Sequence, residues 1–194
     1  MATTINQETY LVFTDTLGNS NKFWKAVVNG TKLEVRWGRV GYQAQCKIHE
    51  CGSEQEAEAK MDQLVQSKLR KGYQESAENL QGFSEVSRAV SLLQTIRSYV
   101  EQRNFDNFHY ITALNNYLSL VPTPLGMKID PATVYRSVSD VDYQIGVLNQ
   151  FVVNSRNTAK QNESRPATST TTNPNQNKAV SLKSISKSLW RFLG

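Results

Sequence analysis

The dipeptide Asn29-Gly30 lies between two runs of residues that have the composition of β-strands, 22–28 (KFWKAVV) and 33–37 (LEVRW). A third such run, residues 8–14 (ETYLVFT), precedes them. All three are rich in aromatic and β-branched residues, which favour strands. Asn-Gly between two strands indicates a hairpin, because both central residues of a type I′ turn need positive φ. The sequence therefore predicts an antiparallel sheet near the N-terminus.

Alternation along residues 32–37 predicts the two faces of the third strand. Leu33, Val35 and Trp37 share one face, whereas the intervening residues are charged. Gly38 and Gly41 follow, and they indicate a sharp bend before a further strand at about 42–50.

An amphipathic helix is predicted over residues 53–71. Ser53 and Glu56 form the S-x-x-E pattern of a capping box, and Gly72 is placed to end the helix. Between them, apolar residues recur every three or four positions: Ala57, Met61, Leu64, Val65 and Leu69. We therefore expect residues 1–77 to form a small antiparallel sheet covered on one face by one helix.

After a short linker predicted at 78–83, apolar residues recur every three or four positions, which is the spacing of amphipathic helices. Helices are predicted at about 84–101, 105–120 and 138–153. Pro122 and Pro124 interrupt the pattern, because proline cannot continue a helix. Residues 84–153 are thus expected to form a small all-α bundle, and the chain as a whole to be of the α+β class.

The C-terminal region divides into two segments of opposite character. Residues 154–180 are almost free of large apolar side chains and are expected to be a disordered linker. Residues 181–194 predict a cationic amphipathic helix that docks on a partner. Its apolar residues are Leu182, Ile185, Leu189, Trp190 and Leu193. Candidate partners are a membrane surface, a protein groove, the inner face of a protein shell, DNA, or the helical bundle of the same chain.

Composition restricts where the chain acts. It has 194 residues, a formal charge of +5 and two cysteines. No apolar run is long enough to span a membrane, and the N-terminus lacks the features of a secretory signal. We therefore expect a cytoplasmic or nucleoid-associated protein that is not secreted. The net charge comes from residues 154–194, which carry seven Lys and Arg and one acid; residues 20–47 are a second, locally basic region.

Residues 8–75 resemble a WGR domain. The resemblance rests on NKFWKAVV, on VRWGRVG with the tripeptide Trp37-Gly38-Arg39, and on a capped helix ending in KLRKGY. This family is known from DNA-dependent poly(ADP-ribose) polymerases, where the domain lies against the end of broken DNA. The resemblance implies that Trp37 packs on a terminal sugar-phosphate and that Arg39 links the DNA side to regulatory helices. Nucleic-acid contacts from Asn21, Lys22 and Tyr73 are also implied.

The chemistry of these residues agrees with that role. An indole offers a flat apolar surface to a sugar or base, and Arg and Lys neutralise phosphates. Neither contact reads base edges, so recognition would follow DNA structure rather than sequence. The alternative is that Trp37 is a core residue, since it shares a strand face with Leu33 and Val35.

Residues 84–153 resemble part of the helical regulatory domain that follows the WGR domain in those polymerases. The resemblance rests on ALNNYLSLVPTPLGMK and DVDYQIGVLNQF, in which Pro124-Leu125-Gly126 and Lys128 match a Pro-Leu-Gly-Lys turn with one residue inserted. A generic three-helix bundle is the alternative. Too little sequence follows for a transferase domain, so we expect no enzymatic activity, no NAD site and no other cofactor.

No metal site is expected either. Cys46, His49 and Cys51 do not have zinc-finger spacing, and His109 lies among aromatic residues on a predicted helix. The sequence thus favours a non-catalytic module that binds DNA ends or breaks. An adaptor or cargo protein that docks through residues 181–194 is the alternative.

Overall fold

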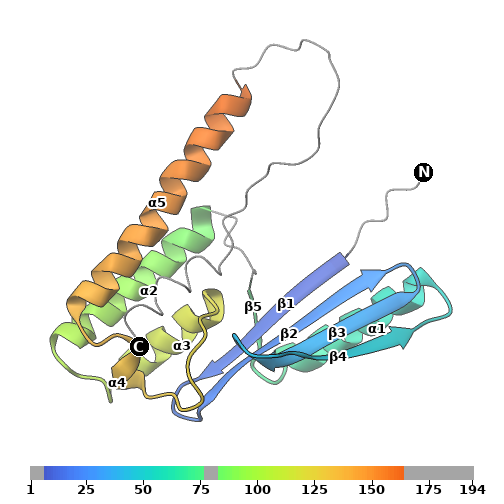
Figure 1. Ribbon diagram of the computed structural model, residues 1–194, viewed down its shortest axis with the longest axis horizontal. Helices are drawn as coiled ribbons and strands as arrows, with labels where there is room; N and C mark the ends of the chain where they lie inside the picture. The colour runs from blue at the N-terminus through green and yellow to red at the C-terminus, as the bar shows by residue number, and fades with distance from the viewer. Residues whose placement is uncertain (1–6, 77–82, 164–194) are drawn as a thin grey trace.

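The computed structural model describes residues 7–76 and 83–163. These residues form an antiparallel sheet and a group of helices (Figure 1). The strands are β1 (Gln7–Asp15), β2 (Ser20–Asn29), β3 (Lys32–Arg39), β4 (Gln45–Glu50) and β5 (Gln74–Glu75). The helices are α1 (Glu54–Leu69), α2 (Phe83–Glu101), α3 (Phe108–Leu120), α4 (Pro131–Val134) and α5 (Val138–Glu163). The expected α+β class is confirmed.

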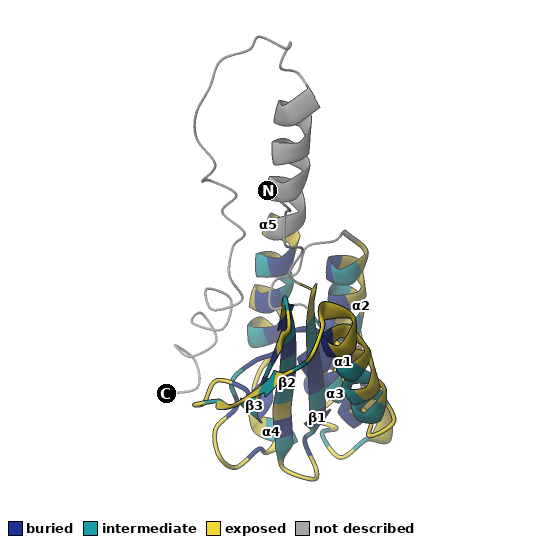
Figure 2. Cartoon of the chain, turned by 90° about the vertical axis from the view of Figure 1, so that its right-hand side faces the viewer, coloured by how far each residue is buried: buried dark blue, intermediate teal, exposed yellow. Residues whose placement is uncertain are grey.

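The sheet has the strand order β4-β3-β2-β1-β5, and all neighbouring strands are antiparallel. Its register aligns Leu11, Trp24 and Trp37 on adjacent strands. Helix α1 covers this face, and its outer side is exposed (Figure 2). The buried residues between sheet and helix are Leu11, Trp24, Ala26, Val28, Leu33, Val35, Ala57 and Met61. This apolar core stabilises the sheet domain, because its side chains are removed from water.

The β2–β3 hairpin has the expected position but not the expected turn. Asn29 pairs with Lys32, so the turn residues are Gly30 and Thr31. Gly30 has a φ of +57°, and among the described residues other than glycine only Asn19 and Arg103 have positive φ. The prediction of a type I′ turn centred on Asn29-Gly30 is therefore wrong, because Asn29 continues the strand ladder.

The start of α1 agrees with the predicted cap. The side chain of Ser53 accepts a hydrogen bond from Glu56 N at 3.1 Å. Glu56 Oε2 accepts one in return from Gly52 N at 2.7 Å, one residue before the donor of a standard capping box. After α1, Gly72 has a φ of +83° and turns the chain toward β5, a short edge strand that the sequence did not indicate.

Helices α2, α3 and α5 pack around a second core (Figure 1). Helix α3 begins at Phe108 rather than at 105, because the side chain of Asn107 accepts a hydrogen bond from His109 N at 2.8 Å and caps the helix there. Helix α4 was not predicted. On the surface, Arg97 of α2 and Asp142 of α5 form a bidentate ion pair, with Nε–Oδ1 at 2.7 Å and Nη2–Oδ2 at 3.2 Å.

Helix α5 corrects the boundary expected at Asn154. Its backbone remains helical to Glu163, so the linker predicted over 154–180 does not begin at 154. Residues 154–163 contain neither Pro nor Gly, and a helix that has begun on packed residues can continue through polar ones.

Residues 77–82 and 164–194 lie outside the described part of the chain. Most of the predicted linker at 78–83, the rest of the C-terminal linker and the whole docking segment 181–194 fall there, and they stay predictions. None of the helices in residues 7–76 and 83–163 has the length and apolar character needed to cross a membrane.

Candidate nucleic-acid interface

Trp37, Gly38 and Arg39 are the last residues of β3, at one end of the sheet. The register sets Arg39 beside Lys22 of β2. Because side chains alternate along a strand, Trp37 and Arg39 lie on the α1 face and Gly38 on the opposite face. The tripeptide thus places an aromatic and a cationic residue on the same face, next to a second cation.

Gly38 lies where the chain folds back on itself after β3. A Cβ at this position would lie 3.3 Å from the backbone oxygen of Gln43 and 3.5 Å from the ring of Phe23. The first distance is shorter than an ordinary carbon contact, so a larger residue would have to displace the segment after Gly41. Glycine therefore allows the close return of the chain beside Arg39.

The Trp37 side chain is half-buried and packs against the core under α1. Its neighbour across the β2–β3 pair, Trp24, is a buried member of that core. The core interpretation of Trp37 therefore holds for part of the side chain. The accessible remainder is the surface on which a sugar or base could pack.

The guanidinium group of Arg39 binds the loop between α3 and α4. Nη2 donates to the carbonyl oxygen of Gly126 at 2.8 Å and to that of Met127 at 3.3 Å, and Nε donates to Gly126 O at 3.2 Å. Nη1 and Nη2 also donate to the backbone and side-chain oxygens of Asn19, each at 3.2 Å. Arg39 thus joins the sheet to the helical part of the chain.

Asn19 supports the same junction and was not among the predicted site residues. It has a φ of +50° in the β1–β2 turn. Its Nδ2 donates to Met127 O at 3.1 Å, and its Oδ1 accepts from Ile129 N at 2.9 Å. The only signal in the sequence was the turn-rich composition of DTLGNSN, which does not reveal a partner more than a hundred residues away.

A glycine and a proline meet at the same junction. Gly41 has a φ of +84°, and a Cβ there would lie 2.4 Å from the Cβ of Pro124. The glycine after the tripeptide and the proline of the PTPLG segment therefore fit against each other. Both were quoted in the family resemblances, but their contact could not be predicted from either segment alone.

Cationic and aromatic side chains gather beside Lys22, at the C-terminal end of α1. Lys68 Nζ lies 5.1 Å from the centroid of the Tyr73 ring, and this ring lies 5.6 Å from that of Phe13, which pairs with Lys22 across β1 and β2. Burial lowers the pKa of Lys68, and the charges of Lys71 and Lys22 lower it further. Lys68 is therefore close enough to both Lys22 and Lys71 to be repelled by each, an arrangement that an anion would stabilise.

We call Lys22, Lys68, Lys71, Tyr73 and Phe13 the cationic cluster. Lys22 and Tyr73 were predicted site residues, and the structure brings them together. Lys68 and Lys71 were not named as site residues, although they belong to the KLRKGY segment. Burial raises the pKa of Tyr73, so its phenol stays protonated and neutral near pH 7.

Comparison with protein families gives a match to the family model of the WGR domain over residues 7–80. Residues 7–80 are a WGR domain. The matched range contains the sheet, α1, Trp37, Arg39 and the cationic cluster, and it supports a role in binding DNA. Helices α2 to α5 lie outside the match, so their resemblance to a polymerase regulatory domain stays a prediction.

Other comparisons add little to the WGR match. No curated protein matches the chain. Among solved structures, the crystal structure of a Bacteroides fragilis protein, a structural genomics target, matches with 28% sequence identity and a TM-score of 0.35. The match covers 42% of this chain and 26% of that one.

Asn21 of the WGR domain is not on the surface, in contrast to its expected contact with nucleic acid. Its side chain is 0% exposed, its Nδ2 donates to Thr123 O at 2.8 Å, and its Oδ1 accepts from the Thr14 hydroxyl at 3.4 Å. The polar group is thus satisfied inside the junction between sheet and helices. The prediction is corrected: Asn21 holds the loop after α3 rather than facing a ligand.

Cys46, His49 and Cys51 of the WGR domain do not converge on one point. Cys46 and His49 occupy opposite faces of β4, and Cys51 packs against the core under α1. Within residues 7–76 and 83–163, no three His, Cys, Asp or Glu side chains form a group that could hold a metal ion.

Proposed function

We propose that this chain is a non-catalytic protein that binds DNA ends or breaks through its WGR domain. The cationic cluster carries the DNA-binding part of the proposal, and the preference for ends rests on the resemblance of the WGR domain to those of the polymerases. Lys22 and Lys71 each repel the partly buried Lys68, whose ammonium nitrogen lies 5.1 Å from the centroid of the Tyr73 ring, and a phosphate would relieve this repulsion. The accessible part of Trp37 lies on the same face.

The arrangement suits a phosphate backbone rather than base edges. Lysine is a point charge that can approach phosphate from many directions, whereas base reading needs paired donors and acceptors at fixed geometry. Arg39 is engaged with Gly126, Met127 and Asn19. We therefore assign phosphate binding to the lysines and assign Arg39 to holding the two parts of the chain together.

A binding titration of the full chain tests this proposal. The probes are a blunt linear duplex, a nicked duplex and a closed circular duplex of equal length, each at several salt concentrations. We expect tighter binding to the first two. The triple variant Lys22→Gln/Lys68→Gln/Lys71→Gln should lower the slope of log affinity against log salt by about 0.9 for each phosphate that it no longer neutralises.

Lys47→Gln is the matched control, because it removes one charge from an exposed position on β4 of the same domain. It should leave the end preference unchanged. Equal affinity for linear and closed duplexes would contradict the end-binding proposal. An unchanged salt slope in the folded triple variant would contradict the assignment to the cationic cluster.

The non-catalytic part of the proposal has its own test. The full chain is incubated with labelled NAD in the presence of nicked DNA, and transfer of label to protein is measured. We expect none. Transfer that depends on the chain would contradict this part while leaving the DNA-binding result unaffected.

A further inference from the structure

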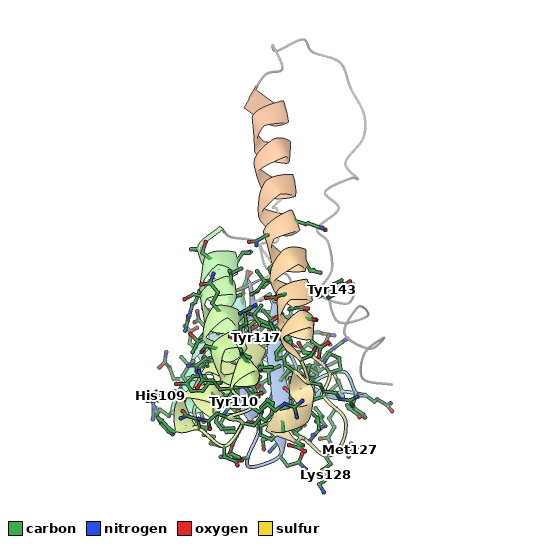
Figure 3. The ribbon with its side chains drawn as sticks, turned by 90° about the vertical axis from the view of Figure 1, so that its left-hand side faces the viewer. His109, Tyr110, Tyr117, Met127, Lys128 and Tyr143 are labelled. Atoms are coloured by element: carbon green, nitrogen blue, oxygen red, sulfur yellow. The ribbon has the colours of Figure 1, made fainter. Side chains whose placement is uncertain are left out.

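Three exposed apolar side chains surround the junction held by Arg39. Leu17 lies in the β1–β2 turn, Tyr42 follows β3, and Met127 lies in the loop between α3 and α4. Their exposed fractions are 72%, 42% and 67%. Figure 3 shows Met127 and Lys128 projecting from the lower end of the molecule. These apolar side chains are therefore exposed to water, although the backbone of their segments is held by hydrogen bonds.

The backbone beneath these side chains is fixed by hydrogen bonds. Met127 O accepts from Asn19 Nδ2 and from Arg39 Nη2, and Tyr42 N donates to Arg39 O at 3.1 Å. Leu17 precedes Asn19 by two residues in a turn closed by the bond from Gly18 N to an Asp15 carboxylate oxygen. The carbonyl group of Met127 is thus held by two hydrogen bonds, whereas its side chain is 67% exposed.

We call Leu17 and Met127 the apolar tip, and the cations around it are Lys22, Arg39 and Lys128. Lys128 follows Met127 and is exposed, and Lys22 lies beside Arg39 on the adjacent strand. Two carboxylates lie next to the same loops: Asp15, the last residue of β1, accepts a hydrogen bond from Gly18 N, and Asp130, the N-cap of α4, accepts one from Ala132 N. Three cations and two carboxylates thus surround the apolar tip, so its rim has a small excess of positive charge and is called the cationic rim.

We propose that Met127 and Leu17 contact the open face of the terminal base pair of a DNA end. This inference rests on the proposed function. A terminal pair offers a flat apolar face that is covered by a neighbouring pair everywhere else in a duplex, and its edges carry phosphates. An apolar tip with a cationic rim is complementary to that shape and charge.

This contact supplies a reason for preferring ends. Phosphate contacts of the cationic cluster form anywhere along a duplex, because they are independent of sequence and of position. Apolar side chains that pack on unstacked bases add affinity only where a base face is open. Met127 is the residue inserted between the Gly and Lys of the Pro-Leu-Gly-Lys turn, so the insertion itself provides the tip.

Fluorescence of 2-aminopurine tests the contact directly. Two blunt duplexes carry the probe, one in the terminal pair and one in the centre, and each is titrated with the full chain. We expect a change in emission for the terminal probe alone. The double variant Leu17→Ser/Met127→Ser should abolish this change and reduce the ratio of linear to closed-duplex affinity about three- to tenfold.

Ile48→Ser is the matched control, because Ile48 is 56% exposed on β4 of the same domain. It should change neither signal. The double variant should retain the wild-type salt slope, since it removes no charge. Thermal unfolding of all three proteins checks that they fold.

The outcomes separate this inference from the proposed function. If DNA binds with a salt-dependent affinity but the terminal probe behaves like the central one, the base-pair contact is wrong and the phosphate contacts stand. The same conclusion follows if the folded double variant keeps its full end preference. If no duplex binds at all, both proposals are wrong.

Discussion

Arg39 donates two hydrogen bonds to the carbonyl oxygen of Gly126, from Nη2 at 2.8 Å and from Nε at 3.2 Å, across 87 positions of sequence. The arginine of the WGR tripeptide therefore holds the loop that leads out of α3. The resemblance to the polymerases implied that Arg39 contacts the helical part of the chain, and the structure shows such a contact. A contact of Arg39 with DNA stays a prediction.

Arg39→Ala should destabilise the junction. The variant lacks the hydrogen bonds from a charged donor to the oxygens of Asn19, Gly126 and Met127, so we expect the free energy of unfolding to fall by about 1–3 kcal/mol. Hydrogen exchange of the amides at 125–129 should become faster. Arg36→Ala, at an exposed position of the same strand, is the control and should leave that exchange unchanged. Equal exchange in both variants would argue against the junction.

Gly41→Ala should be more damaging than Gly30→Ala. Both glycines have positive φ, but a Cβ at Gly41 would lie 2.4 Å from Pro124 Cβ, whereas nothing lies within 4 Å of a Cβ at Gly30. We expect a loss of about 1–2 kcal/mol at Gly30 from backbone strain and about 2–4 kcal/mol at Gly41 from strain and overlap. Denaturant titration measures the free energy of unfolding of both variants, and equal losses would show that the contact with Pro124 does not contribute to stability.

Asn21→Ala should lower the stability of the protein rather than its affinity for DNA. The variant leaves Thr123 O without its buried donor, which costs about 1–3 kcal/mol in the free energy of unfolding. Asn29→Ala, at an exposed position of the same strand, should change the unfolding free energy far less. If Asn21→Ala instead kept full stability and reduced the affinity for DNA, Asn21 would be a ligand contact after all.

Lys68→Met should stabilise the protein without DNA. The pKa of Lys68 is lower in the folded chain than the 10.5 of a free lysine side chain, so folding disfavours its charged form. The unfolded chain therefore binds the proton more tightly, and wild-type stability should rise with pH between the folded and unfolded pKa values. The advantage of the variant should be greatest below the folded pKa and should shrink as the pH approaches 10.5.

Chemical denaturation of wild type and Lys68→Met across this pH range measures the effect. Lys47→Met is the control, because its exposed position on β4 lies outside the cationic cluster. A lower stability of Lys68→Met at neutral pH would mean that the stacking of Lys68 on Tyr73 outweighs burial and repulsion.

Local patterns predicted the elements of the fold well. The strand pairing around Gly30, the Ser53 cap and the helical stripes depend on residues close in sequence, so they could be found from spacing alone. The errors have local causes too. The cap from Asn107 moved the start of α3, and a polar sequence without Pro or Gly continued α5 beyond Asn154.

The site was predicted less completely than the fold. Lys22 and Tyr73 were predicted as site residues, and both lie in the cationic cluster. Lys68 was not predicted, because it lies beside them only where the end of α1 packs near strands β1 and β2. Asn21 was misassigned for a similar reason. The position of Asn21 beside Lys22 on a strand does not indicate that its side chain will be buried and will donate to the carbonyl oxygen of Thr123, more than a hundred positions later.

Local sequence patterns were enough to predict that a sheet with one capped helix precedes a set of helices, and to find the WGR tripeptide. Those features depend on periodicity, turn residues and short motifs, which act over one element at a time. The roles of the polar residues around that tripeptide, in contrast, follow from contacts between distant segments. Whether Asn21 faces water or Thr123, and whether Arg39 is free or bound to Gly126, depends on desolvation and hydrogen bonds between segments that meet only when the chain folds.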